Sequence, residues 1–221
     1  MNDILVSILV ILLVVVIVVA IFVLTGRKEK ELEAAIQQLA QRSSWKFEKV
    51  NLVQQSGFIL RGEGWMLESL VSSTDRTSDA GSSPVSYSNK WTTDQVTSPG
   101  GLVLVGPKTP AIQFGLGELV LQKELHLMLG DQSDQATGLA EVFVGRTPFR
   151  DRYSVWAASQ ETAEKMLGFD LENALLNWKS KELPLLKFTA SGVEILTRQG
   201  RIDTPKEVQA MVELGMAVLG R

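Results

Sequence analysis

Three arginines within seven residues form the densest group of side chains suited to chemistry in this chain. Arg146, Arg150 and Arg152 lie in the segment from Gly145 to Tyr153. A guanidinium is planar and binds phosphate oxygens in pairs, so this spacing predicts a contact with phosphate or with an anionic lipid head group. The alternative is a solvated turn in which Asp151 is the local partner, and this more ordinary interpretation stays open.

Two residue types limit the other kinds of site. The chain has no cysteine, which excludes disulfides, thiol nucleophiles and cysteine metal sites. Its one histidine, His126, cannot form a zinc site that needs two, and it falls on a polar face whether its segment is a helix or a strand. The spacing from Gly101 to Lys108 imitates a phosphate-binding loop, but Pro107 interrupts it. We therefore expect no cofactor and no metal, and we assign no catalytic residue.

Carboxylates leave one enzymatic alternative open. The chain has 25 Asp and Glu residues, and a pair of carboxylates can perform acid–base chemistry with neither Cys nor His. The sequence does not show whether two of them converge in a cleft. A carboxylate-based hydrolase or transferase is therefore the alternative function.

One of the five tryptophans stands apart from the others. Trp45, Trp65, Trp156 and Trp178 lie in periodic strands or helices, where burial in a core is the ordinary explanation. Trp91 lies in a stretch rich in Ser and Thr. It is therefore the candidate for an exposed contact.

The run from Ile4 to Leu24 predicts a transmembrane helix. Nineteen of its 21 residues are Leu, Ile, Val or Phe. At about 1.5 Å per residue such a helix is about 31 Å long, which matches a hydrocarbon core of roughly 30 Å. Basic residues follow the run and only Asp3 precedes it, so the N-terminus is expected outside and the rest in the cytoplasm, with the chain a single-pass protein of the inner (plasma) membrane.

The remaining chain predicts an α+β fold. The anchor is expected at residues 1–26 and a stalk helix at 27–43, packed against the domain or against a second copy. Residues 44–221 alternate in the pattern of a largely antiparallel sheet with several helices. A flexible Ser/Thr-rich insertion is expected near 72–101, with Thr74 to Lys90 as its mobile part. Residues 114–129 fit either a helix or a strand, with helix preferred.

The strongest local signals lie near the C-terminus. Strands are expected at 185–189 and 193–197, joined as a hairpin. Thr204, Pro205 and Glu207 then predict the start of the last helix, with a capping box.

The segment from Phe149 to Ala157, together with the span, the basic stalk and the Trp-x-Phe strand, resembles membrane-anchored bacterial proteins of unknown function. The resemblance is best over residues 140–221. It implies a bacterial membrane protein and transfers no site residue.

The anchor and the lack of a convergent polar motif predict a non-enzymatic, membrane-tethered domain that binds a protein partner or scaffolds an assembly. An anionic-lipid-binding module is a further alternative. The net charge of −3 and the absence of a long basic block do not suggest nucleic acid.

Overall fold

A computed structural model describes residues 30–73, 85–108, 138–180, 182–197, 200–202 and 204–220. Within these ranges, nine strands form one sheet in the order β1-β2-β3-β4-β9-β8-β5-β7-β6, and every neighbouring pair is antiparallel. The strands are β1 (Lys46–Leu52), β2 (Gln55–Gly62), β3 (Trp65–Ser73), β4 (Val85–Thr93), β5 (Val103–Pro107), β6 (Ala140–Val142), β7 (Tyr153–Ala157), β8 (Leu185–Thr189) and β9 (Gly192–Thr197). The α+β prediction is confirmed.

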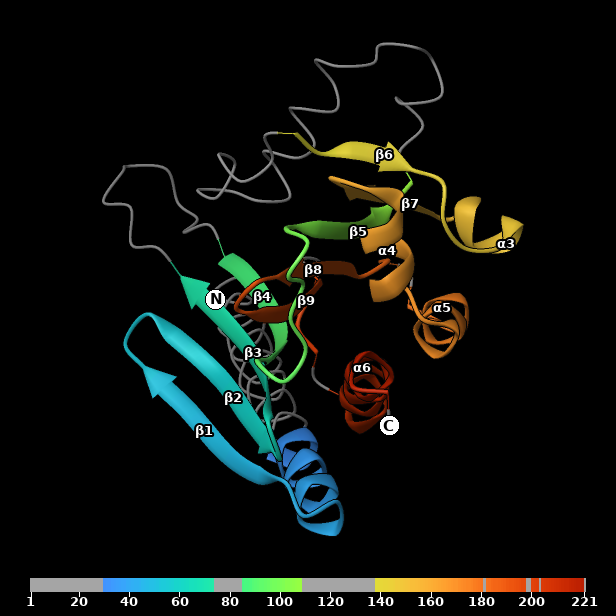
Figure 1. The fold of residues 1–221 in the computed structure, drawn as a ribbon. Coiled ribbons are helices and arrows are strands. Elements are labelled where there is room, and N and C mark those ends of the chain that lie inside the picture. Colours follow the sequence, from blue (N-terminus) through green and yellow to red (C-terminus); the bar gives the residue numbers. More distant parts are fainter. Residues whose placement is uncertain are drawn as a thin grey trace, which may run out of the picture.

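The helices cover one face of this sheet (Figure 1). They are the helical residues 30–42, α3 (Thr147–Arg150), α4 (Gln160–Met166), α5 (Phe169–Leu176) and α6 (Pro205–Val218). Side chains alternate between the two faces of a strand, so one register row supplies the core. The row consists of Leu60, Leu67, Trp91, Ile195, Leu186, Val105 and Val155. All seven are buried in the core.

Residues 30–42 belong to the fold of the domain. Ile36 is 3% exposed and Ala40 is fully buried, and both belong to the core. Glu33 also forms an ion pair with Lys49 of β1, at 2.5 Å. A helix is thus confirmed over residues 30–42 of the predicted 27–43, and it packs against the domain, which is one of the two alternatives that the sequence left open.

The C-terminal predictions are also confirmed. Strands β8 and β9 form the expected hairpin. The Thr204 side chain accepts from the backbone of Glu207, and the Glu207 side chain accepts from the backbone of Thr204, which is a complete capping box at the start of α6.

The insertion expected near 72–101 is wrong at residues 72–73, which belong to β3, and at residues 85–93, which form β4. Strand β4 lies inside the sheet, between β3 and β9. Its buried polar side chain Asn89 is satisfied by partners distant in sequence. The Asn89 oxygen accepts from Ser69 at 2.8 Å and from the backbone of Ile202 at 3.1 Å, and its nitrogen donates to Thr197 at 3.2 Å and to the Gly200 carbonyl at 2.9 Å. These bonds compensate for burial of the amide, which composition alone does not reveal.

Several predictions fall outside the described residues. They are the span Ile4 to Leu24, residues 74–84, the helix preferred over 114–129, and His126. Within the described ranges, no helix has both the length and the apolar character needed to cross a membrane.

Candidate functional site

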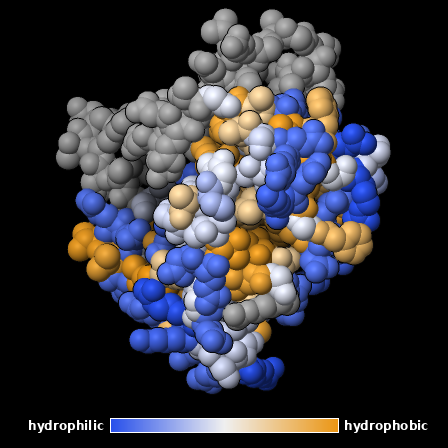
Figure 2. Space-filling model, in the orientation of Figure 1, coloured by the Kyte–Doolittle hydropathy of each residue, from blue (hydrophilic) through white to orange (hydrophobic). Residues whose placement is uncertain are grey.

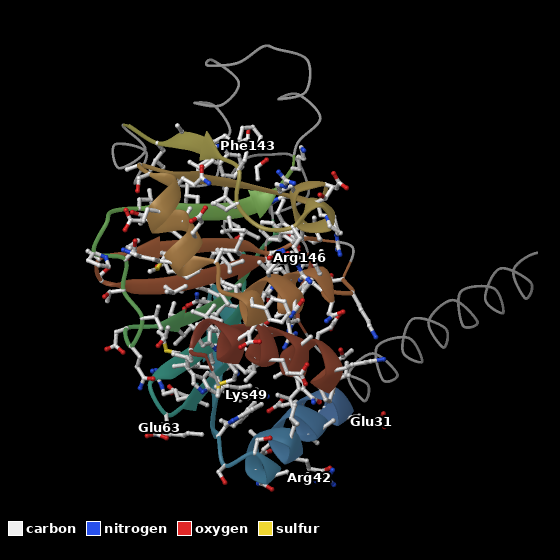
Figure 3. The ribbon with its side chains drawn as sticks, turned by 45° about the vertical axis from the view of Figure 1, so that its right-hand side comes forward. Glu31, Arg42, Lys49, Glu63, Phe143 and Arg146 are labelled. Atoms are coloured by element: carbon white, nitrogen blue, oxygen red, sulfur yellow. The ribbon has the colours of Figure 1, made fainter. Side chains whose placement is uncertain are left out.

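Arg146 is bound to helix α5. It precedes α3, and its Nε lies 2.7 Å from Oε1 of Glu172, which also accepts from the Arg146 backbone N–H at 3.1 Å. A second guanidinium nitrogen donates to Asn173 at 2.5 Å, and the group lies 5.0 Å from the centre of the Phe169 ring. The Glu172 side chain is only 8% exposed, so Arg146 supplies the charge that a buried carboxylate needs. Figure 3 labels Arg146 in this position.

Arg152 closes the opposite end of α5. Its guanidinium donates to the carbonyls of Leu176, at 2.8 Å, and Trp178, at 3.4 Å. The last carbonyls of a helix lack partners within the helix and carry partial negative charge, so a cation is favourable there. Both partners are neutral carbonyls, so neither of them compensates the positive charge of Arg152 as a carboxylate would.

Arg150 is exposed, and its guanidinium donates only to the Thr147 hydroxyl, at 3.2 Å, among the described contacts. Its backbone carbonyl accepts from the Lys108 ammonium at 2.9 Å. Sequence reasoning did not include Lys108 in this group. Lys108 lies beside Arg152 because Pro107 pairs with Tyr153. The periodicity of a single segment does not reveal this pairing between two strands.

The structure gathers the three arginines around one turn but does not aim them at one ligand. Arg146 and Arg152 are held by contacts within the chain, and Arg150 is the one with a free guanidinium edge in the described part. The carboxylate partner of the turn is Glu172 rather than the Asp151 that the sequence suggested. Contact with an anion stays a prediction.

Tyr153 lies beside Arg152 and is held in its neutral form. Burial raises the pKa of its phenol to about 12, against a smaller opposing effect of Arg152, and the hydroxyl donates to the Leu175 carbonyl at 3.2 Å. The ring stacks on Phe149 at 5.1 Å between centroids. Tyr153 therefore joins β7 to α5 as a structural residue.

The prediction that Trp91 is exposed is wrong. It is 0% exposed, and its ring stacks on Trp65 with centroids 6.4 Å apart. Its other side meets α6 at Gly215. Residues on either side of Trp91 are polar because neighbours along a strand point to opposite faces of the sheet. The tryptophan itself points to the helix-covered face.

Two hollows lie elsewhere on the domain. A cleft of about 500 Å³ lies where the β2–β3 and β8–β9 turns meet, with Asp94 and Glu194 among its walls. The hydroxyls of its three threonines already donate to backbone carbonyls: Thr92 to Met66, Thr93 to Gly64 and Thr189 to Gly192. A groove of about 320 Å³ separates residues 30–42 from α6, with Leu39, Val212 and Met216 in its lining.

The carboxylate alternative gains no support from the described residues. Glu172 is the only buried carboxylate there, and Arg146 neutralises it. No group of three or more His, Cys, Asp or Glu side chains in the same ranges is close enough to hold a metal ion.

The most exposed large aliphatic side chains described lie at the β1–β2 turn. Val53 is fully exposed and Leu52 is 65% exposed. Figure 2 shows this turn as hydrophobic surface at the left edge of the view. Strand β1 is an end strand of the sheet and pairs only with β2 among the described strands.

Comparison of the chain with protein-family models, with curated proteins and with solved structures finds no match.

Proposed function

We propose that this chain is a non-enzymatic, membrane-tethered domain that binds a protein partner close to the bilayer. In this proposal Ile4 to Leu24 is the single span of a bacterial inner-membrane protein, with the domain in the cytoplasm. The proposal rests on the length and hydrophobicity of that run and on the resemblance of the chain to membrane-anchored bacterial proteins.

The packing of residues 30–42 is the observation that carries the proposal. Ile36 and Ala40 are buried in the domain, so the chain is fixed to the domain from the start of this helix. Only residues 25–29 separate that point from Leu24. Even fully extended, so short a segment reaches about 20 Å. In this proposal the span therefore holds the domain close to the membrane, because the segment that connects them is short.

The partner contact that the geometry favours is the β1 edge with the exposed turn at Leu52 and Val53. An end strand offers unpaired backbone groups to an extended segment of another protein, and exposed aliphatic side chains beside it add apolar contact. Charged side chains along β1 (Lys46, Glu48 and Lys49) discourage unspecific pairing.

A photo-crosslinking amino acid at position 53 tests this proposal in the full chain within its own membrane. Position 53 is fully exposed, so the replacement leaves folding unaffected. We expect one discrete adduct, which mass spectrometry identifies, and we expect Leu52→Asp to abolish it.

Phe143 provides the matched control, since it is 73% exposed and lies on β6's side of the sheet, far from β1 in strand order. The same crosslinker at position 143 is expected to give no such adduct. Equal adducts from both positions, or none from position 53, would refute the β1 contact. An adduct with the mass of two chains would identify the partner as a second copy.

A further inference from the structure

The start of the N-terminal helix and the arginine turn lie toward the same side of the domain (Figure 3). Register partners join Lys49, Phe58, Ser69, Asn89 and Thr197 in one row across five strands. This row crosses the middle of β1, β2, β3 and β4 and reaches the last residue of β9. Strands β8, β5 and β7 follow in the sheet, where Pro107 at the end of β5 pairs with Tyr153 at the start of β7.

Two groups of residues are placed along this arrangement. Glu33 bonds to Lys49 at the middle of β1, and Lys108 and Arg152 are next to the paired residues Pro107 and Tyr153. Strands rotate by about 20–25° from one to the next. In Figure 3, Arg146 and Glu31 nevertheless lie toward the same side of the domain, and Glu63 lies toward the other.

Positive charge is concentrated beside the arginine turn. The basic cluster consists of Lys108, Arg150, Arg152 and Lys179. The Lys108 ammonium bonds to the carbonyl of Arg150, and Arg152 bonds to the carbonyl of Trp178, which precedes Lys179. None of the four forms an ion pair with a carboxylate in the described part of the chain.

Two nearby carboxylates reduce this charge without cancelling it. Asp151 lies within the turn, and Glu182 lies close to Trp178, whose indole nitrogen donates to the Glu182 carbonyl at 2.8 Å. Among the described residues around the turn, four cations thus stand against two carboxylates. If the span is as proposed, residues 25–29 hold the start of the N-terminal helix, which lies toward the same side of the domain in Figure 3, within about 20 Å of the bilayer.

We propose that the basic cluster docks the domain onto the head groups of anionic phospholipid in the membrane that holds the span. This inference rests on the tether of the proposed function. Arg150 and Lys179 supply free cationic side chains, Lys108 adds charge beside them, and Arg152 is fixed in place by α5. Arg146 is not part of this lipid contact, because its guanidinium is already paired with Glu172.

The test places the full chain in nanodiscs of phosphatidylcholine, with or without phosphatidylglycerol. The chain has no cysteine, so Ser180→Cys gives a single labelling site next to Lys179. Energy transfer from a donor at this site to an acceptor on lipid head groups then reports docking. We expect higher transfer with phosphatidylglycerol, and a fall toward the phosphatidylcholine value as salt rises from 0.01 to 1 M, where the screening length shortens from about 30 to about 3 Å.

A pair of matched variants separates this cluster from general charge. Arg150→Gln with Lys179→Gln removes two exposed cations from the cluster, and Arg42→Gln with Lys46→Gln removes two exposed cations outside the cluster, at the end of the N-terminal helix and the start of β1. We expect the first variant to lower the ratio of docked to undocked domain by about fivefold per cation, and the second to leave it unchanged.

The outcomes distinguish the two proposals. A chain that inserts but shows the same transfer in both lipids would refute lipid docking and leave the tether standing. An equal loss in both variants would also refute the cluster. A chain that fails to enter the discs would refute the tether and the docking together. Unchanged thermal unfolding of both variants shows that no loss comes from misfolding.

Discussion

Arg146 shows how a residue suited to binding a ligand is instead used within the fold. Its guanidinium pairs with a Glu172 carboxylate that is almost fully buried, bonds to Asn173 and lies on Phe169. Sequence spacing predicted three equivalent arginines, because spacing shows which side chains are near one another but not which buried groups need them. The partner carboxylate is 26 residues away, on a helix whose position depends on the whole sheet.

Replacing Arg146 is expected to destabilise the domain where replacing Arg150 does not. Arg146→Gln leaves Glu172 without its cation, which costs about 1–3 kcal/mol as a buried unsatisfied group, toward the lower end because Arg146 itself is half exposed. Arg150→Gln should change the free energy of unfolding by less than about 0.5 kcal/mol, as at most surface sites. Urea unfolding of the full chain in mild detergent measures both.

The double variant Arg146→Gln with Glu172→Gln provides the control. It removes the charge that Arg146→Gln leaves unpaired, so it should recover part of the loss. Similar stability of the Arg146 and Arg150 variants would contradict the structural role given to Arg146.

Tyr153 makes stability depend on pH in the alkaline range. Its pKa is raised by burial to about 12 in the folded state, against an ordinary value of 10.0. The contribution is fully present below pH 10. Between pH 10 and about 12 the unfolded chain releases the phenol proton and the folded chain keeps it, so stability falls as pH rises, by at most about 1.4 kcal/mol per pH unit.

Tyr153→Phe isolates this effect from the other groups that titrate at high pH. The variant loses the bond to the Leu175 carbonyl, but its stability should fall less steeply than that of the native chain between pH 10 and 11. Parallel curves from urea unfolding at these pH values would show that Tyr153 does not carry the dependence.

At the scale of elements, the sequence predicted the helices and strands whose signals lie within a few neighbouring residues. The capping box of α6 and the β8–β9 hairpin depend on residues only a few positions apart, and both are confirmed. Most of strand β4 was instead assigned to the flexible insertion, because its stability comes from distant partners. Asn89 is satisfied by residues more than 100 positions away on β9 and the loop after it, and Trp91 is covered by α6. For the same reason, the sequence did not predict that Lys108 lies beside the three arginines.

The contact between α6 and β4 depends on a glycine within the helix. A Cβ on Gly215 would overlap the indole ring of Trp91. Glycine in a helix is usually worse than alanine by roughly 0.5–1 kcal/mol, so Gly215→Ala would ordinarily stabilise a helix. Here we expect the opposite sign, a loss of about 1–3 kcal/mol, because overpacking forces the helix from the sheet or the ring from its position.

Thermal or urea unfolding of Gly215→Ala measures this loss, and Trp91→Phe tests its cause. A smaller ring makes room for the methyl group, so the double variant should lose less than the sum of the two single variants. A stabilised Gly215→Ala chain, or strict additivity in the double variant, would contradict the close packing of α6 on β4.

The whole molecule is organised by the helix at residues 30–42, which is part of the core and also the link to the apolar run. Its apolar stripe was readable from the sequence, but the choice between packing on the domain and packing on a second copy was not. The structure places Ile36 and Ala40 in the same core as α6 and the sheet. The β1 edge and the basic cluster therefore have fixed positions relative to this helix.

Topology is the property on which the proposed function most depends. Arg27, Lys28 and Lys30 follow the apolar run and Asp3 is the only charged side chain before it, and basic flanks are retained on the cytoplasmic side. A reporter enzyme that is active only in the cytoplasm, joined after Arg221, is therefore expected to work, and one that needs export is expected to be silent. Changing Asn2 and Asp3 to Lys, together with Arg27, Lys28 and Lys30 to Gln, should reverse both results, because it moves the basic flank to the other end of the span. An export-dependent reporter that works in the native chain would place the domain outside, away from the anionic cytoplasmic leaflet that the basic cluster is proposed to contact.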